Sequence, residues 1–138
     1  MRKYFKIILV FVWMAIIFIF SNQPAVVSDE KSRLVIRVFQ FLGLNLDSIL
    51  GELANFIIRK IAHFLEYLIL YLLLFNALSK GISLKKKLIL ALFIVFLYAC
   101  TDEFHQLFVS GRTGRIRDVI IDTFGGGAGA LILHFKSK

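Results

Sequence analysis

Four ionisable residues lie at the start of a long apolar stretch that begins near residue 53. Arg59, His63 and Glu66 are spaced by four and three residues, which places them on one face of a helix, with Lys60 and Tyr67 beside it. A histidine held by a carboxylate can exchange protons near neutral pH, whereas arginine and lysine can bind phosphate or carboxylate groups. The alternative interpretation is a set of hydrogen bonds between helices, with the basic side chains reaching towards a membrane interface.

Two further groups of polar residues each lie at one end of an apolar segment. They are Asp102, Glu103, His105 and Gln106 in the first group, and Arg112, Arg115, Arg117, Asp118 and Asp122 in the second. Asp102, His105 and Gln106 share a helical face, and so do Asp118 and Asp122. Ionisable groups at membrane depth usually face other helices or a wet cavity. If the connections between segments are short, all three groups lie at the same depth, which predicts a polar pocket.

The elements that must position these residues are predicted to be membrane-spanning helices. Of the 138 residues, 59% are hydrophobic, well above the roughly 45–50% of soluble domains. The apolar segments predict an all-α, single-domain bundle over residues 1–138 with four spans, at about 4–20, 53–78, 88–108 and 116–135. The rival interpretation of the first segment is a signal peptide, but no small-x-small cleavage pattern follows it. Gly125-x-x-x-Gly129 predicts a close contact between helices.

A short amphipathic helix is predicted between the first two spans, at residues 29–42, with Ser28 as its N-cap. It is too short and too charged to cross a membrane, so we expect it at the extracytoplasmic surface. Residues 44–51 are expected to be a linker, and residues 79–87 a basic loop. The single cysteine, Cys100, allows no disulfide within the chain.

The distribution of charge predicts the topology. With both termini and the 79–87 loop on one side, that side collects nine cations and no acid: Arg2, Lys3, Lys6, Lys80, Lys85, Lys86, Lys87, Lys136 and Lys138. The positive-inside rule makes this side cytoplasmic. The net charge of +8 is therefore better explained by membrane topology than by nucleic-acid binding. We expect a multi-pass protein of the bacterial cytoplasmic membrane with both termini inside, in contact with membrane lipids.

Four motifs in order resemble those of the VanZ-like family of small bacterial membrane proteins, and the resemblance covers nearly the whole chain. The motifs are Phe20-Ser21-Asn22-Gln23-Pro24, Arg59-Lys60-x-x-His63-Phe64-x-Glu66-Tyr67, Asp102-Glu103-x-His105-Gln106-x-Phe108, and Arg112 with Asp118-Val119-Ile120-Ile121-Asp122-Thr123-x-Gly125. The family often has Asn where this chain has Asp122, and Pro where it has Val109-Ser110. The resemblance implies a cell-envelope membrane protein, linked in some members to reduced susceptibility to glycopeptides such as teicoplanin. It implies no established catalytic mechanism.

Two function classes fit these residues. The favoured class is an envelope protein that binds an anionic lipid-linked or cell-wall ligand in an outward-facing pocket. Its expected binding residues are Arg59, Lys60, His63, Glu66, Tyr67, Asp102, Glu103, His105, Gln106, Arg112, Asp118 and Asp122. The alternative is an intramembrane enzyme that uses a metal or a His–carboxylate pair, with His63, Glu66, Asp102, Glu103 and His105 as catalytic candidates.

No cofactor is expected from a recognised motif, because the spacings match no metalloprotease signature. If a divalent metal is bound, the candidate ligands are His63, Glu103 and His105.

Overall fold

The computed structural model describes residues 2–79 and 81–137, apart from the side chains at positions 2, 47 and 52. Every regular element in these ranges is a helix, so the predicted all-α class is confirmed. The elements are α1 (Arg2–Ser21), α2 (Ala25–Phe41), α3 (Leu46–Leu50), a 3-10 turn (Gly51–Leu53), α4 (Ala54–Ala77), α5 (Leu84–Gln106) and α6 (Ile116–Lys136).

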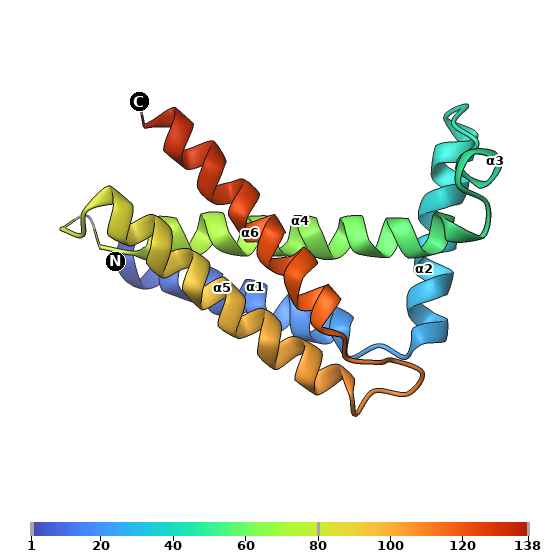
Figure 1. Cartoon of the computed structure of the whole chain (residues 1–138), viewed down its shortest axis with the longest axis horizontal. Coiled ribbons are helices and arrows are strands. Elements are labelled where there is room, and N and C mark those ends of the chain that lie inside the picture. The colour runs from blue at the N-terminus through green and yellow to red at the C-terminus, as the bar shows by residue number, and fades with distance from the viewer. Residues whose placement is uncertain (1, 80, 138) are drawn as a thin grey trace.

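The four long helices run back and forth along the molecule, and α4 lies at their centre. Figure 1 shows the N-terminus, the α4–α5 turn and the C-terminus at one end, and α2 with the α5–α6 connection at the other. Helix α4 contacts α1, α2, α5 and α6, whereas α2 lies crosswise at the end where α4 begins. The three groups of polar residues identified in the sequence are therefore at the same end of the molecule.

The apolar core lies between α1, α4 and α5. Its buried members are Val10, Ile17, Tyr67, Leu70, Tyr71, Leu74, Ala91, Val95 and Ala99. Side-chain hydrogen bonds to backbone carbonyls fix α1 against its neighbours. Trp13 Nε1 donates to the carbonyl of Glu66 at 2.9 Å, and the Tyr98 hydroxyl donates to that of Met14 at 2.6 Å. Each indole or phenol has its apolar ring in the packed interior and satisfies its own polar atom.

The outer faces of the long helices are apolar. Phe11, Phe93 and Phe124 are each more than half exposed, with exposed fractions of 64%, 54% and 66%. A soluble monomer rarely exposes so many large apolar side chains, whereas lipid chains surround them without cost. Among the residues that the structure describes, two helices are long and apolar enough to cross a membrane by length and composition, within Lys3–Ser21 and Leu84–Gln106. Helices α4 and α6 are 24 and 21 residues long and run beside them.

Several predicted boundaries need correction. The helix expected at 29–42 begins at Ala25, directly after Pro24, so Ser28 lies inside α2 and does not cap it. Proline needs no hydrogen-bond acceptor and has its φ angle fixed, so it is well tolerated where a helix starts. The 44–51 segment contains α3 and the start of the 3-10 turn, so it is not an irregular linker.

The expected 79–87 loop is shorter than predicted. Helix α5 begins at Leu84, so Lys85, Lys86 and Lys87 lie in its first turn. The ammonium group of Lys87 lies 4.2 Å from the centre of the Phe75 ring, a cation–π contact that fixes this turn against α4. Lys80 and Lys138, which entered the charge argument, lie outside the described residues.

Candidate functional site

The polar ends of α4, α5 and α6 meet. Lys60 Nζ of α4 lies 2.6 Å from Asp118 Oδ2 of α6. Glu103 of α5 accepts a hydrogen bond of 2.9 Å from the backbone N–H of Arg115, the residue that precedes α6. These two contacts bring together groups that are separated by 12 to 58 residues along the chain.

Two glycines allow α6 to approach α4 closely enough for this contact. A Cβ atom at Gly125 would collide with the backbone carbonyl of Phe64 in α4, and one at Gly129 would lie 2.7 Å from the ring of Tyr71. Both glycines follow Asp118 and Asp122 along the buried face of α6. The small residues thus bring the two backbones together, and the acids one and two turns earlier are directed at α4.

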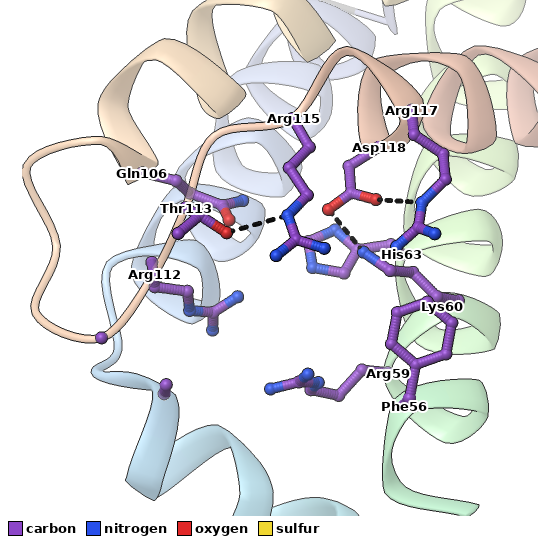
Figure 2. Close-up of a pocket in the computed structure, with 12 residues that line it drawn as sticks. Phe56, Arg59, Lys60, His63, Gln106, Arg112, Thr113, Arg115, Arg117 and Asp118 are labelled. Carbon is purple, nitrogen blue, oxygen red and sulfur yellow. Dashed lines mark hydrogen bonds and ion pairs between the residues drawn. The ribbon is translucent and has the colours of Figure 1, made fainter. Parts of the chain in front are cut away.

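A basic pocket of about 260 Å³ lies at this end of the bundle. It is lined by Ala25, Phe56, Arg59, Lys60, His63, Gln106, Gly111, Arg112, Thr113, Arg115, Arg117 and Asp118. Figure 2 shows the guanidinium groups of Arg59, Arg112 and Arg115 directed towards one another across this space. Five of the lining side chains are cationic, and Asp118 is the single acid among them. The pocket therefore has an excess of positive charge, which favours an anion.

The cations of the pocket differ in how they are compensated. Lys60 and Arg117 both approach Asp118, at 2.6 and 3.8 Å, and Arg59 forms an ion pair of 2.8 Å with Asp29 of α2. Within the described part of the chain, neither Arg112 nor Arg115 forms an ion pair.

Arg112 also has a perturbed guanidinium. Burial lowers the pKa of Arg112, and the positive charge of Arg59 lowers it further. Both effects mean that the charged form of Arg112 is less well stabilised here than in water. An anion in the pocket would stabilise this charged form.

Arg112 also holds the α5–α6 connection against the turn between α1 and α2. Its Nε donates to the carbonyl of Gln23 at 3.0 Å, and one terminal nitrogen donates to the carbonyl of Phe20 at 3.4 Å. The backbone N–H of Ala25 in turn donates to the carbonyl of Ser110 at 3.2 Å. The Phe20–Pro24 motif therefore has a structural role, because the α5–α6 connection is hydrogen-bonded to its backbone carbonyls.

His105 lies beside the turn between α1 and α2 and does not line the basic pocket. The prediction that it shares a face with Asp102 and Gln106 is therefore corrected. Asp102 and Gln106 are buried, but His105 is only half-buried, and its Nε2 lies 3.0 Å from Asn22 Oδ1. Its ring contacts that of Phe18 with centroids 4.5 Å apart. A residue three positions after Asp102 falls on the edge of the shared face, and here that edge is turned towards α1.

A second set of polar residues is buried between the helices. One ligand atom from each of His63, Asp102 and Asp122 lies within 4.8 Å of the other two. His63 Nδ1 is 3.7 Å from Asp122 Oδ1 and 3.9 Å from Glu66 Oε2. Asp122 is 1% exposed, and Tyr67 is fully buried. This grouping differs from the predicted metal candidates, because Glu103 is bound to the Arg115 amide and His105 to Asn22.

A mostly apolar groove of about 190 Å³ adjoins the basic pocket, between α1, α2 and α4. Its apolar lining includes Phe20, Val35, Ile58 and Ala62, and Glu66 also lines it. The groove and the basic pocket share three lining residues, Arg59, His63 and Arg112. The basic pocket and the apolar groove are thus neighbours, with these three side chains between them.

The predicted binding residues fall into distinct places. Those that line the basic pocket are Arg59, Lys60, His63, Gln106, Arg112 and Asp118. Glu66 lines the adjoining groove. Tyr67, Asp102, Glu103 and Asp122 are buried among the helices, and His105 lines neither the pocket nor the groove.

Phe56 and Thr113 belong to the pocket but were missed by the sequence analysis. Phe56 could have been found, because it precedes Lys60 by one helical turn and its ring centre lies 5.4 Å from Lys60 Nζ. Thr113 carries no such signal, since it lies in an irregular connection whose path depends on tertiary contacts.

Comparison with known proteins bears on the class of molecule. The VanZ/LLP1 family model matches residues 5–137, nearly the whole chain. Neither curated proteins nor solved structures gave a significant match. The family match, the two helices of spanning length and the apolar outer faces together indicate a membrane protein. They are consistent with a cell-envelope protein linked to glycopeptide resistance. This chain belongs to the VanZ/LLP1 family.

Proposed function

We propose that this protein binds a lipid-linked anion of the cell envelope, with its phosphate in the basic pocket and its hydrocarbon chain in the adjoining groove. The observation that carries the proposal is that the two spaces adjoin each other and share Arg59, His63 and Arg112 as lining. A free anion needs only the first space, and a neutral lipid only the second. A ligand that has both parts uses all of the lining.

Arg112 and Arg115 are the proposed phosphate-binding residues. Both line the pocket and neither is paired with an acid among the described residues. Guanidinium groups bind phosphate oxygens through two parallel hydrogen bonds, which makes arginine well suited to this role. Lys60 and Arg117 both approach Asp118, so their positions in the pocket are set by that carboxylate when a ligand binds.

We further propose that four helices, α1, α4, α5 and α6, span the membrane, with both termini in the cytoplasm. Two considerations support this topology: the N-terminus, the α4–α5 turn and the C-terminus lie at one end of the molecule, and the lysine run 85–87 is at that end. The basic pocket is at the opposite end, so it would open to the extracytoplasmic leaflet.

A binding assay on purified protein tests the ligand proposal. A polyprenyl phosphate and the uncharged polyprenol of equal chain length are titrated in detergent, for the wild type and for Arg115→Ala. A charge-assisted hydrogen bond contributes about 1.5–3 kcal/mol, so Arg115→Ala should raise the Kd for the phosphate at least about tenfold. The polyprenol should bind weakly to both proteins.

Arg33→Ala is the matched control, because Arg33 is exposed on α2 and lines neither the basic pocket nor the groove. Equal losses in Arg33→Ala and Arg115→Ala would contradict the pocket as the binding site. Inorganic phosphate is added as a competitor. If it displaces the polyprenyl phosphate at comparable concentrations, the groove contributes nothing and the lipid part of the proposal is wrong.

A contribution to glycopeptide resistance is proposed from family membership. Expression of the wild-type protein in a susceptible bacterium should raise the inhibitory concentration of teicoplanin, and Arg115→Ala at equal membrane level should not. An equal effect of both proteins would separate resistance from the basic pocket.

An intramembrane enzyme is the second candidate, favoured by the 3.7 Å approach of His63 to Asp122. Such a pair could move a proton during cleavage of a bound ligand. Mass spectrometry of polyprenyl diphosphate incubated with the protein would reveal any product. A catalytic role for Glu66, which lies 3.9 Å from His63, requires that Glu66→Gln abolishes product formation while ligand binding remains.

A further inference from the structure

The buried interior of the bundle contains more acidic groups than its basic side chains can pair with. Asp102 and Asp122, from α5 and α6, are 3% and 1% exposed. Among the described residues, no lysine or arginine forms an ion pair with either carboxylate. The nearby ammonium group of Lys60 is paired with Asp118 at 2.6 Å. Two buried carboxylates without a cation are unfavourable unless something else supplies positive charge.

The polar atoms around these carboxylates also lack partners. His63 Nδ1, Asp102 Oδ1, Asp122 Oδ2 and the Tyr67 hydroxyl are buried and form no hydrogen bond with any described residue. Buried polar atoms are nearly always hydrogen-bonded, so four unpaired atoms from three helices in one neighbourhood need an explanation. A structural network of helix-to-helix hydrogen bonds does not explain them, because these four atoms form no such bond among the described residues.

The positions of one imidazole and two carboxylates explain these unpaired atoms. Ligand atoms of His63, Asp102 and Asp122 lie within 4.8 Å of one another, which is the spacing around a single ion once the side chains close on it. We infer that His63, Asp102 and Asp122 bind one divalent metal ion, with α4, α5 and α6 each contributing a ligand.

The donor set indicates which ion. One imidazole nitrogen and two carboxylate oxygens suit zinc or manganese, and the two negative charges balance the two positive charges of the ion. Magnesium is less suited, because it prefers an all-oxygen environment with several waters. Three protein ligands leave a coordination position open. His63 also lines the basic pocket, so the ion lies at the boundary between the helix interior and that pocket.

This inference rests on the mutual distances of His63, Asp102 and Asp122 and not on the proposed ligand, although His63 also lines the basic pocket and the groove. Its test uses metal binding alone. The full chain is purified in detergent through a tag without histidines, stripped with a chelator, and equilibrated separately with zinc and manganese. Elemental analysis after desalting should give about one ion per chain. Cobalt should also bind, with a visible absorption band that reports the nitrogen and oxygen ligands.

Matched variants locate the site. His63→Ala and Asp122→Asn should lose the ion, whereas His105→Ala and Glu103→Gln should retain it. The last two remove a histidine and a carboxylate from the same end of the bundle but not from the trio. If Asp122→Asn fails to fold, His63→Gln serves instead. The ion should raise the Tm of the wild type and leave that of His63→Gln unchanged.

Folded wild-type protein that binds none of these ions would overturn the inference. In that case a proton shared by Asp102 and Asp122 would account for the buried acids. An ion retained equally by His63→Ala and by His105→Ala would also overturn it. Neither result bears on whether polyprenyl phosphate binds, so the two proposals can fail separately.

Discussion

The ammonium nitrogen of Lys60 lies 2.6 Å from Asp118 Oδ2, and this contact joins the second turn of α4 to the first turn of α6 at the polar end of the bundle. Both side chains are largely buried, with exposed fractions of 19% and 12%. A second pair at the same end, Arg59 with Asp29, has a similar distance of 2.8 Å but is more exposed, at 28% and 41%. The two pairs therefore allow a direct comparison of how burial changes the contribution of an ion pair to stability.

We predict that Lys60→Met destabilises the protein strongly, because it leaves Asp118 buried without its closest cation. Breaking a buried pair from one side costs about 3–5 kcal/mol, whereas an exposed pair is worth about 0–1 kcal/mol. Thermal unfolding in detergent should therefore show a much larger loss for Lys60→Met than for Arg59→Met. Similar losses for the two variants would mean that the buried pair is screened like the exposed one.

The close crossing of α6 over α4 makes a second prediction at the glycines. Gly125→Ala places a methyl group against the carbonyl of Phe64 and should destabilise the protein by about 1–3 kcal/mol. Gly127→Ala is the control, since a Cβ there meets no atom within 4 Å. It removes a flexible residue from a helix interior and should be neutral or stabilising by about 0.5–1 kcal/mol. Thermal unfolding would measure both, and equal effects would disprove the close contact at Gly125.

The hydrogen bonds of Arg112 predict a local effect on the loop it fastens. In Arg112→Ala the carbonyls of Phe20 and Gln23 lose their donor, so the amides of residues 20–23, 25 and 107–112 should exchange faster with deuterium. Arg115→Ala should leave the 20–25 segment unchanged, because the Arg115 side chain is bonded to Thr113 within its own connection. Faster exchange in both variants would indicate a general loosening and not a specific anchor.

The proposed topology predicts which turns can be labelled from outside the cell. In a Cys100→Ser background, Ser110→Cys should react with a membrane-impermeant maleimide in intact cells. Ser79→Cys should react only after the membrane is opened. Both positions are exposed, Ser79 in the α4–α5 turn and Ser110 in the α5–α6 connection, and Figure 1 shows this turn and this connection at opposite ends of the bundle. Labelling of both in intact cells would exclude the four-span arrangement with both termini inside.

The sequence was most informative where helical periodicity alone decides the outcome. Asp118 and Asp122 are four residues apart, and Gly125 and Gly129 continue their face, so their common burial on α6 was predictable. The face containing Asp102 and Gln106 was predictable for the same reason, since both are buried. Helix ends were less predictable, as the start of α2 at Ala25 illustrates.

Pairings across the chain could not be obtained from periodicity. His105 is bonded to Asn22, which is 83 residues away and lies just after the end of α1. No local pattern indicates that this turn, with the carbonyls of Phe20 and Gln23, receives the α5–α6 connection. The grouping of His63 with Asp122 could not be predicted for the same reason. It depends on the register in which α6 packs against α4, which is set where Gly125 and Gly129 contact Phe64 and Tyr71.

The pairing of Lys60 with Asp118 has a consequence for how the chain is made. Helix α4 is synthesised before α6, so Lys60 in its second turn has no acid from α6 to pair with at that stage. Until α6 is synthesised, Lys60 therefore lacks the acid that it pairs with in the folded protein. A chain truncated before residue 116 lacks Asp118, so we expect it to be much less stable than the full chain because Lys60 is left without its ion pair.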